Sequence, residues 1–227
     1  MRQIAPSILS ANYIKISEII KILEKKGVDL IHVDAIDGVF APNIGFSPKF
    51  VKEIASITDI PLDIHLMFCN PLKFVTLYID AGARMISAHI ESLDLASAEK
   101  FLEIVEERGI LKGFAIKPST EIPEWLNNLL EKVDYIVPMS VEPGFSGQKF
   151  IPQILSRIEN FNILRKKRGY HYLIEADGGV NKENIKSLIE KGVDIFVIGA
   201  GIFGSNDIEE SLEYFKKIVK EDGDKFG

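Results

Sequence analysis

The 227-residue sequence has little of several features, and each shortage excludes a class of protein. Its single cysteine, Cys69, rules out an intramolecular disulfide and fits a reducing compartment. No apolar run approaches the roughly 20 residues that a membrane span requires, and the N-terminus lacks the pattern of a signal peptide. An excess of positive charge is also lacking, because 27 basic and 33 acidic residues give a net charge of −6 and no basic stripe is present. We therefore expect a cytoplasmic protein that binds neither membrane nor nucleic acid.

The composition is otherwise that of a globular protein, with 46% hydrophobic and 26% charged residues. Short apolar segments alternate with amphipathic segments eight times along the chain. The expected strands are residues 4–9, 28–35, 61–67, 84–90, 112–116, 133–139, 172–177 and 194–199. The expected helices are residues 14–26, 48–57, 71–81, 95–108, 122–132, 150–168, 182–191 and 208–219.

This alternation predicts an α/β protein with a parallel sheet covered by helices. Eight repeats in a chain of this length favour a closed (β/α)₈ TIM barrel, and an open doubly wound sheet is the alternative. No linker rich in Pro, Gly and Ser divides the repeats, so we expect one domain over residues 1–227. The polar residues 220–227 are expected to form a frayed tail.

The active site of such a barrel lies at the carboxyl ends of its strands. On the second strand His32 and Asp34 are two residues apart, so both side chains point to one face. Burying this pair is costly unless the two residues bind each other or a ligand. His65 and Asp177 stand at the ends of two other strands. Two imidazoles and two carboxylates suit one divalent metal ion: zinc, iron(II), manganese or cobalt.

Other strand ends and loops carry further candidates. Asp63 and Glu175 lie two residues before His65 and Asp177, so they are expected to face the interior one layer deeper, as partners of the ligands or as satisfied polar groups. His89 is expected to be a pocket wall or a satisfied polar residue. A rival hypothesis gives Lys117, at the end of the fifth strand, a Schiff base with a carbonyl substrate.

Three glycine groups follow the last three strands. These glycines are Gly144 with Gly147, Gly178 with Gly179, and Gly199 with Gly201. Loops at this position of a barrel often bind phosphate, because glycine lets an anion approach backbone N–H groups closely. The sequence therefore predicts a phosphorylated ligand, although glycine also simply makes turns.

Several motifs, in the same order and at the same strand ends, resemble the ribulose-phosphate 3-epimerase family nearly from end to end. The matching segments are Ala5-Pro6-Ser7-Ile8-Leu9-Ser10-Ala11, His32-Val33-Asp34 with Asp37-Gly38, Pro61-Leu62-Asp63-Ile64-His65-Leu66-Met67, Pro143-Gly144-Phe145-Ser146-Gly147-Gln148 and Asp177-Gly178-Gly179-Val180. The resemblance implies a metal-dependent barrel that inverts C3 of a ketose phosphate, most simply D-ribulose 5-phosphate to D-xylulose 5-phosphate.

The same resemblance assigns roles to individual residues. It makes His32, Asp34, His65 and Asp177 the metal ligands, and Asp34 with Asp177 the catalytic acid/base pair. It implies that Ser7, Met67 and Met139 contact the substrate. The phosphate would lie against Gly144, Gly147, Gly178, Gly179, Gly199 and Ala200. The expected partners are a small sugar phosphate and further copies of the chain in a homo-oligomer.

Three positions depart from the family pattern. Ile36 stands where a methionine is common, Glu142 where asparagine or aspartate is more usual, and Ala200 where a serine often supplies a hydroxyl to phosphate. Ser47-Pro48 and the segment 201–203 look rather like the allulose-6-phosphate 3-epimerase branch, so a six-carbon substrate is an alternative. A catalytically silent barrel that binds sugar phosphates is an alternative of another class.

Overall fold

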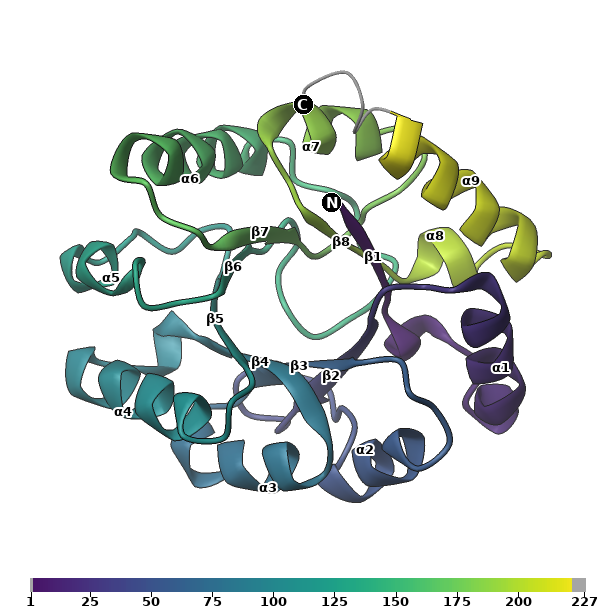
Figure 1. Cartoon of the computed structure of the whole chain (residues 1–227), viewed down its shortest axis with the longest axis horizontal. Coiled ribbons are helices and arrows are strands. Elements are labelled where there is room, and N and C mark those ends of the chain that lie inside the picture. Colours follow the sequence, from purple (N-terminus) through teal and green to yellow (C-terminus); the bar gives the residue numbers. More distant parts are fainter. Residues whose placement is uncertain (1, 222–227) are drawn as a thin grey trace.

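Eight parallel strands form a ring in the structure, a computed structural model that describes residues 2–221. The strands are β1 (Gln3–Pro6), β2 (Ile31–Ile36), β3 (Leu62–Met67), β4 (Ala83–His89), β5 (Leu111–Ile116), β6 (Tyr135–Pro138), β7 (Leu173–Ala176) and β8 (Ile195–Ile198). From β2 to β8 each strand pairs with the next one in chain order, and β8 pairs with β1. The seam between β1 and β2 is joined by a parallel bridge of Ser7 with His32 and by the Leu30 N–H, 3.3 Å from the Ile4 carbonyl. The predicted (β/α)₈ barrel is confirmed (Figure 1).

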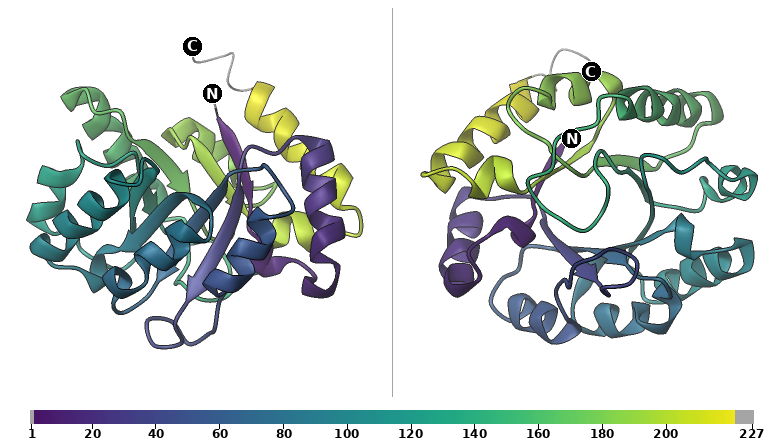
Figure 2. Two further views of the ribbon diagram at one scale, coloured as in Figure 1. Left: turned by 60° about the horizontal axis from the view of Figure 1, so that its bottom comes forward. Right: turned by 180° about the vertical axis from the view of Figure 1, so that it is seen from behind.

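Helices surround this ring on its outer side, as the views in Figures 1 and 2 show. They are α1 (Ile16–Lys26), α2 (Pro48–Ala55), α3 (Val75–Asp80), α4 (Leu95–Glu106), α5 (Glu124–Leu129), α6 (Ile154–Arg168), α7 (Ile185–Lys191), α8 (Ala200–Phe203) and α9 (Ile208–Glu221). The first and last long helices lie side by side, where Lys25 forms an ion pair with Glu209. None of the helices within residues 2–221 combines the length and apolar character of a membrane span.

The strands are buried on both faces, and the two faces carry different residues. On β2 the side chains of Ile31 and Val33 pack in the apolar layer between the strands and the helices. His32 and Asp34 alternate with them and therefore point into the barrel. This alternation explains how an apolar strand presents two ionisable groups to one point.

Differences from the predicted elements lie at the ends of segments. The first strand ends at Pro6, and the 3₁₀ turn Ile8–Ser10 takes the rest of the apolar run. Helix α8 was not predicted, because four residues are too few to show a helical period. Helix α9 extends to Glu221, so the first two residues of the expected tail are helical. Residues 222–227 of that tail lie outside the described residues.

Candidate active site

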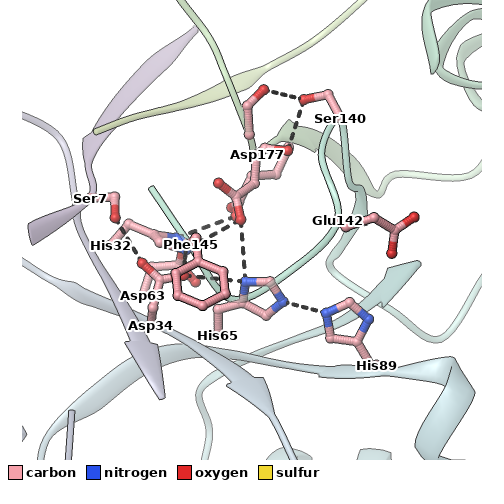
Figure 3. Close-up of polar contacts among 12 residues, drawn as sticks. Ser7, His32, Asp34, Asp63, His65, His89, Ser140, Glu142, Phe145 and Asp177 are labelled. Atoms are coloured by element: carbon pink, nitrogen blue, oxygen red, sulfur yellow. Dashed lines mark hydrogen bonds and ion pairs between the residues drawn. The ribbon is translucent and has the colours of Figure 1, made fainter. Parts of the chain in front are cut away.

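The strand register brings the predicted metal ligands to one place. Strands β2 and β3 pair so that Asp34 lies opposite His65, and His32 lies opposite Asp63 one layer below. Asp177 follows the last residue of β7 and enters the same space from another side of the ring (Figure 3). Among residues 2–221, one donor atom from each of His32, Asp34, His65 and Asp177 lies within 4.8 Å of all the others.

The distances between these donor atoms suit a small divalent ion. His32 Nε2 is 3.5 Å from Asp34 Oδ1 and 3.8 Å from Asp177 Oδ2. His65 Nδ1 is 3.8 Å from Asp34 Oδ1 and 3.3 Å from Asp177 Oδ2. A tetrahedron with metal–ligand bonds of about 2.1 Å has edges of roughly 3.4 Å. The four residues therefore fit a metal such as zinc.

Two buried nitrogen atoms in this cluster have no hydrogen-bond partner within the described part of the chain. They are His32 Nε2 and His65 Nδ1, and both rings are fully buried. An unpaired buried polar atom is expensive, so its presence calls for a ligand. Because both atoms face the two carboxylates, a cation between them satisfies all four residues.

The charges of the cluster also favour a cation. Burial alone raises the pKa of Asp34, but the neighbouring His32, His65 and the Ser7 hydroxyl outweigh burial and leave that pKa below its usual value. Burial alone lowers the pKa of His32, but Asp34 and Asp63 outweigh it and hold the pKa well above its usual value. Both pKa shifts therefore show that the carboxylates of this cluster stabilise a neighbouring positive charge.

A second polar layer lies beneath the cluster. His32 Nδ1 is 2.6 Å from Asp63 Oδ2, and the Tyr135 hydroxyl donates to Asp63 Oδ1 over 3.2 Å. Glu175 Oε1 is 3.6 Å from His32 Nδ1, and burial together with the charge of Asp63 raises the pKa of Glu175 well above its usual value. The expectation that Asp63 and Glu175 face the interior one layer deeper is confirmed, and Asp63 holds the His32 ring.

His89 lies beside the cluster as a satisfied polar residue, as predicted. Its Nε2 is 2.9 Å from His65 Nε2, and its Nδ1 is 3.0 Å from Glu91 Oε2. Burial lowers the pKa of His89 to about 4, so its ring is neutral near pH 7. Lys117 does not line the cavity at the carboxyl ends of the strands, and its ammonium stacks 3.9 Å from the centre of the Phe40 ring.

A cavity of about 320 Å³ opens above the cluster at the carboxyl ends of the strands. Asp34 and Asp177 reach it, as do the other predicted contact residues Ser7, Met67 and Met139. All of the predicted phosphate residues line the same cavity: Gly144, Gly147, Gly178, Gly179, Gly199 and Ala200. This size falls within the usual range for small-molecule sites.

Gly178 illustrates why the wall of this cavity is built from glycine. Its φ of +111° strains any other residue, and a Cβ there would lie 2.5 Å from the Val141 side chain and 2.9 Å from the Val141 N. The loop between β6 and α6 can therefore approach the end of β7 closely and run across the barrel mouth (Figure 2). Asn43 Nδ2 donates to the Gly144 carbonyl over 2.7 Å and ties this loop to the one after β2.

Two serines of the site were missed in the sequence. The Ser140 N–H donates to the Asp177 carbonyl over 2.7 Å, and its hydroxyl lies 2.8 and 2.6 Å from the Asp177 and Gly178 carbonyls, so it holds the end of β7 (Figure 3). The Ser10 hydroxyl is buried without a partner in the described structure, and Ser10 lines the cavity close to Gly199. Ser10 belongs to the segment 5–11 that resembles the family motif, but its position beside Gly199 follows only from the pairing of β1 with β8.

Comparison with known proteins identifies the family of the chain. Residues 3–203 match the model of the ribulose-phosphate 3 epimerase family. Ribulose-phosphate 3-epimerase of Bacillus subtilis is 36% identical over 213 residues, 93% of this chain and 97% of that protein. The enzyme of the same name from Aquifex aeolicus is 36% identical over 219 residues, 96% of this chain and 97% of that protein.

Solved structures with low sequence identity support the fold alone. The 3-hexulose-6-phosphate synthase of Salmonella typhimurium superposes with a TM-score of 0.73 at 15% identity, covering 96% of this chain and 99% of that one. The family model and the two relatives, in contrast, show the family. The chain belongs to the ribulose-phosphate 3-epimerase family, so the predicted enzyme class, a ketose-phosphate 3-epimerase, is confirmed.

Proposed function

We propose that the chain is a metal-dependent epimerase that interconverts D-ribulose 5-phosphate and D-xylulose 5-phosphate. One observation carries the proposal: two carboxylates and two unpaired imidazole nitrogens meet at the floor of a cavity whose wall is formed by three glycine groups. The relatives named ribulose-phosphate 3-epimerase support the choice of a five-carbon substrate.

Asp34 and Asp177 are proposed as the acid and base that act at C3. Inverting this carbon requires removal of its proton on one face of the substrate and delivery of a proton on the other. The two carboxylates come from β2 and β7, different sides of the barrel mouth, and both reach the cavity. The Ser7 hydroxyl donates to Asp34 Oδ2 over 2.7 Å and fixes that carboxylate. A positioned acid–base group contributes roughly 10²–10⁴-fold to the rate.

His32, Asp34, His65 and Asp177 are proposed to hold one divalent ion. When bound, such an ion would polarise the C2 carbonyl and would offset the negative charge that develops on its oxygen, an effect on the order of several kcal/mol. Zinc, iron(II), manganese and cobalt all suit this donor set.

The remaining cavity residues are proposed to bind and shield the substrate. Backbone N–H groups around Gly178, Gly179, Gly199 and Ala200, with those of the 144–147 segment, suit a phosphate. Met67 and Met139 are buried and line the cavity, where apolar, adaptable side chains limit access of water to the reacting carbon.

The two alternatives differ from this proposal in measurable ways. Ser47-Pro48, which favoured a six-carbon substrate, begins α2, since the Ser47 hydroxyl accepts from the Phe50 N–H over 3.4 Å. Neither residue of the pair lines the cavity, whereas Gly201 of the other segment that favoured a six-carbon substrate does. The test is to compare kcat/KM of the metal-loaded enzyme for ribulose 5-phosphate and allulose 6-phosphate. We expect the five-carbon substrate to be preferred, and a lack of turnover of both would favour a silent barrel.

The roles of the two aspartates can be tested by isotope exchange in D₂O. We expect Asp177→Asn and Asp34→Asn, each shown to contain metal, to lose interconversion. Each variant keeps one of the two groups, so each should still exchange the C3 hydrogen of one epimer, and the two variants should prefer opposite epimers. Full epimerase activity of either variant would contradict the two-carboxylate mechanism.

A further inference from the structure

The two histidines of the proposed metal site present different ring nitrogens to it. His32 faces the carboxylates with Nε2, whereas His65 faces them with Nδ1. A neutral imidazole binds a metal through its unprotonated nitrogen, so its hydrogen must be on the other nitrogen. For His32 that hydrogen is on Nδ1, where Asp63 Oδ2 accepts it directly over 2.6 Å. For His65 it is on Nε2, where the neighbour is the His89 ring and, within residues 2–221, not a carboxylate.

The hydrogen on His65 Nε2 determines the protonation of the next ring. His89 Nε2 lies 2.9 Å away and has to accept this hydrogen, so the hydrogen of His89 is on Nδ1 (Figure 3). That Nδ1 is 3.0 Å from Glu91 Oε2, which accepts it. The other carboxylate oxygen, Oε1, accepts the Lys117 N–H over 2.7 Å. Every donor in this series therefore meets an acceptor.

The opposite assignment fails for a physical reason. If His65 carried its hydrogen on Nδ1, its Nε2 would accept from His89 and leave His89 Nδ1 unprotonated. That lone pair would face the Glu91 carboxylate at 3.0 Å, and two acceptors without a hydrogen between them repel each other. Both rings are fully buried, so water cannot relieve this repulsion.

We propose that His89 and Glu91 are positioning residues that fix the tautomer and orientation of His65 and strengthen it as a metal ligand. The inference rests on the proposed metal site and extends it to residues that do not touch the ion. Carboxylate partners of metal-bound histidines are a general device, and their loss typically weakens metal affinity about 10–100-fold. In this chain one ligand is supported directly by Asp63, and the other through an intervening imidazole by Glu91.

The tautomers can be read from the ring nitrogens by long-range ¹H–¹⁵N NMR of the zinc-loaded protein. Only four histidines are present, and His171 is exposed, so the signals are few. We expect the hydrogen on Nε2 of His65 and on Nδ1 of both His32 and His89, with His89→Gln identifying the His89 signals. A hydrogen on Nε2 of His89, or rapid averaging between its two forms, would overturn the proposal.

Zinc affinity provides the second test, with Glu91→Gln as the variant. A carboxamide has one acceptor oxygen, so its NH₂ group must face either the His89 N–H or the Lys117 N–H, and one hydrogen bond is lost. We expect competition with a colorimetric chelator to give a zinc Kd raised about 10–100-fold. Glu142→Gln is the matched control, because it removes the same charge from an exposed side chain on the loop after β6.

The outcomes separate this inference from the proposed function. Wild-type protein that binds zinc, with equal affinities for Glu91→Gln and Glu142→Gln, would overturn the role of Glu91 alone. Wild-type protein that binds no zinc would overturn both the role and the metal site. A purely structural role would lower the unfolding temperature of the metal-free Glu91→Gln protein and leave the zinc Kd of the folded protein unchanged, which would also overturn the inference.

Discussion

Replacing Gly113 with alanine is expected to lower both the stability of the fold and the affinity for metal, although Gly113 is not one of the proposed metal ligands. Gly113 on β5 pairs with Tyr135 on β6, and a Cβ at Gly113 would lie 2.6–2.7 Å from three atoms of the Tyr135 ring. Ordinary contacts begin at 3.4 Å, so the ring must shift by about 0.7 Å. The Tyr135 hydroxyl donates to Asp63, whose other oxygen holds His32, so the shift reaches a proposed metal ligand.

The size of the effect follows from the burial of Tyr135, which has no exposed surface. Overpacking a core typically costs about 1–3 kcal/mol. At roughly 2–4 °C per kcal/mol for a domain of this size, the unfolding temperature should fall by about 2–12 °C. Thermal unfolding of the metal-free protein measures this loss, and chelator competition measures the accompanying fall in zinc affinity.

A control and a double variant isolate the cause. Leu111→Ala changes an exposed residue of the same strand and should leave zinc affinity unchanged. If the strain acts through the Tyr135 hydroxyl, Gly113→Ala should lower zinc affinity less in a Tyr135→Phe background. The coupling free energy between the two substitutions should then be at least about 0.5 kcal/mol. Unchanged unfolding temperature and zinc affinity in Gly113→Ala would refute the reasoning.

Three further predictions concern other parts of the site. The Asp37 carboxylate accepts the N–H groups of Val39, Phe40 and Cys69; burial alone raises its pKa, but these bonds outweigh burial and lower it. The ionised Asp37 carboxylate therefore stabilises the folded protein above its ordinary pKa of 3.8, and this stabilisation is lost as the pH falls through the lower pKa of the folded state. Asp37→Asn should lower the free energy of unfolding in urea by about 1 kcal/mol at pH 7 and by less below pH 3.8. Ala200→Ser should lower KM for ribulose 5-phosphate a few-fold with little change in kcat, and an unchanged KM would show that the added hydroxyl does not reach the phosphate. Removal of metal by a chelator should abolish activity. Zinc added at about 1,000 times its Kd should restore activity and stabilise the protein by about 4 kcal/mol. Activity that survives complete removal of metal would contradict the metal requirement.

The sequence was sufficient to predict the architecture and the four residues that meet at its centre. The alternation of side chains along a strand placed His32 and Asp34 on one face. The location of active sites at the carboxyl ends of barrel strands placed His65 and Asp177 at the same end of the ring. These inferences depend on periodicity and on strand direction, which the chain carries locally. The catalytic and ligand roles of these residues stay predictions.

What the sequence did not reveal depends on side-chain contacts between neighbouring strands of the barrel. Ser140 reads as an ordinary residue after β6, and only the arrangement of β6 and β7 brings it against the Asp177 carbonyl. The His89–Glu91 contact was hidden for the same reason, because it has meaning only once β3 and β4 place His89 against His65. Hydrogen-bond partners across a barrel depend on side-chain direction as well as strand register, which a pattern of apolar residues does not specify.

The order of the proposed metal ligands along the chain has a consequence for biosynthesis. Three of them, His32, Asp34 and His65, lie on the adjacent strands β2 and β3, whereas Asp177 belongs to the end of β7, more than 100 residues later. A growing polypeptide therefore exposes a three-donor site long before the fourth donor leaves the ribosome. The complete donor set can form only after the second half of the barrel has been synthesised and has closed.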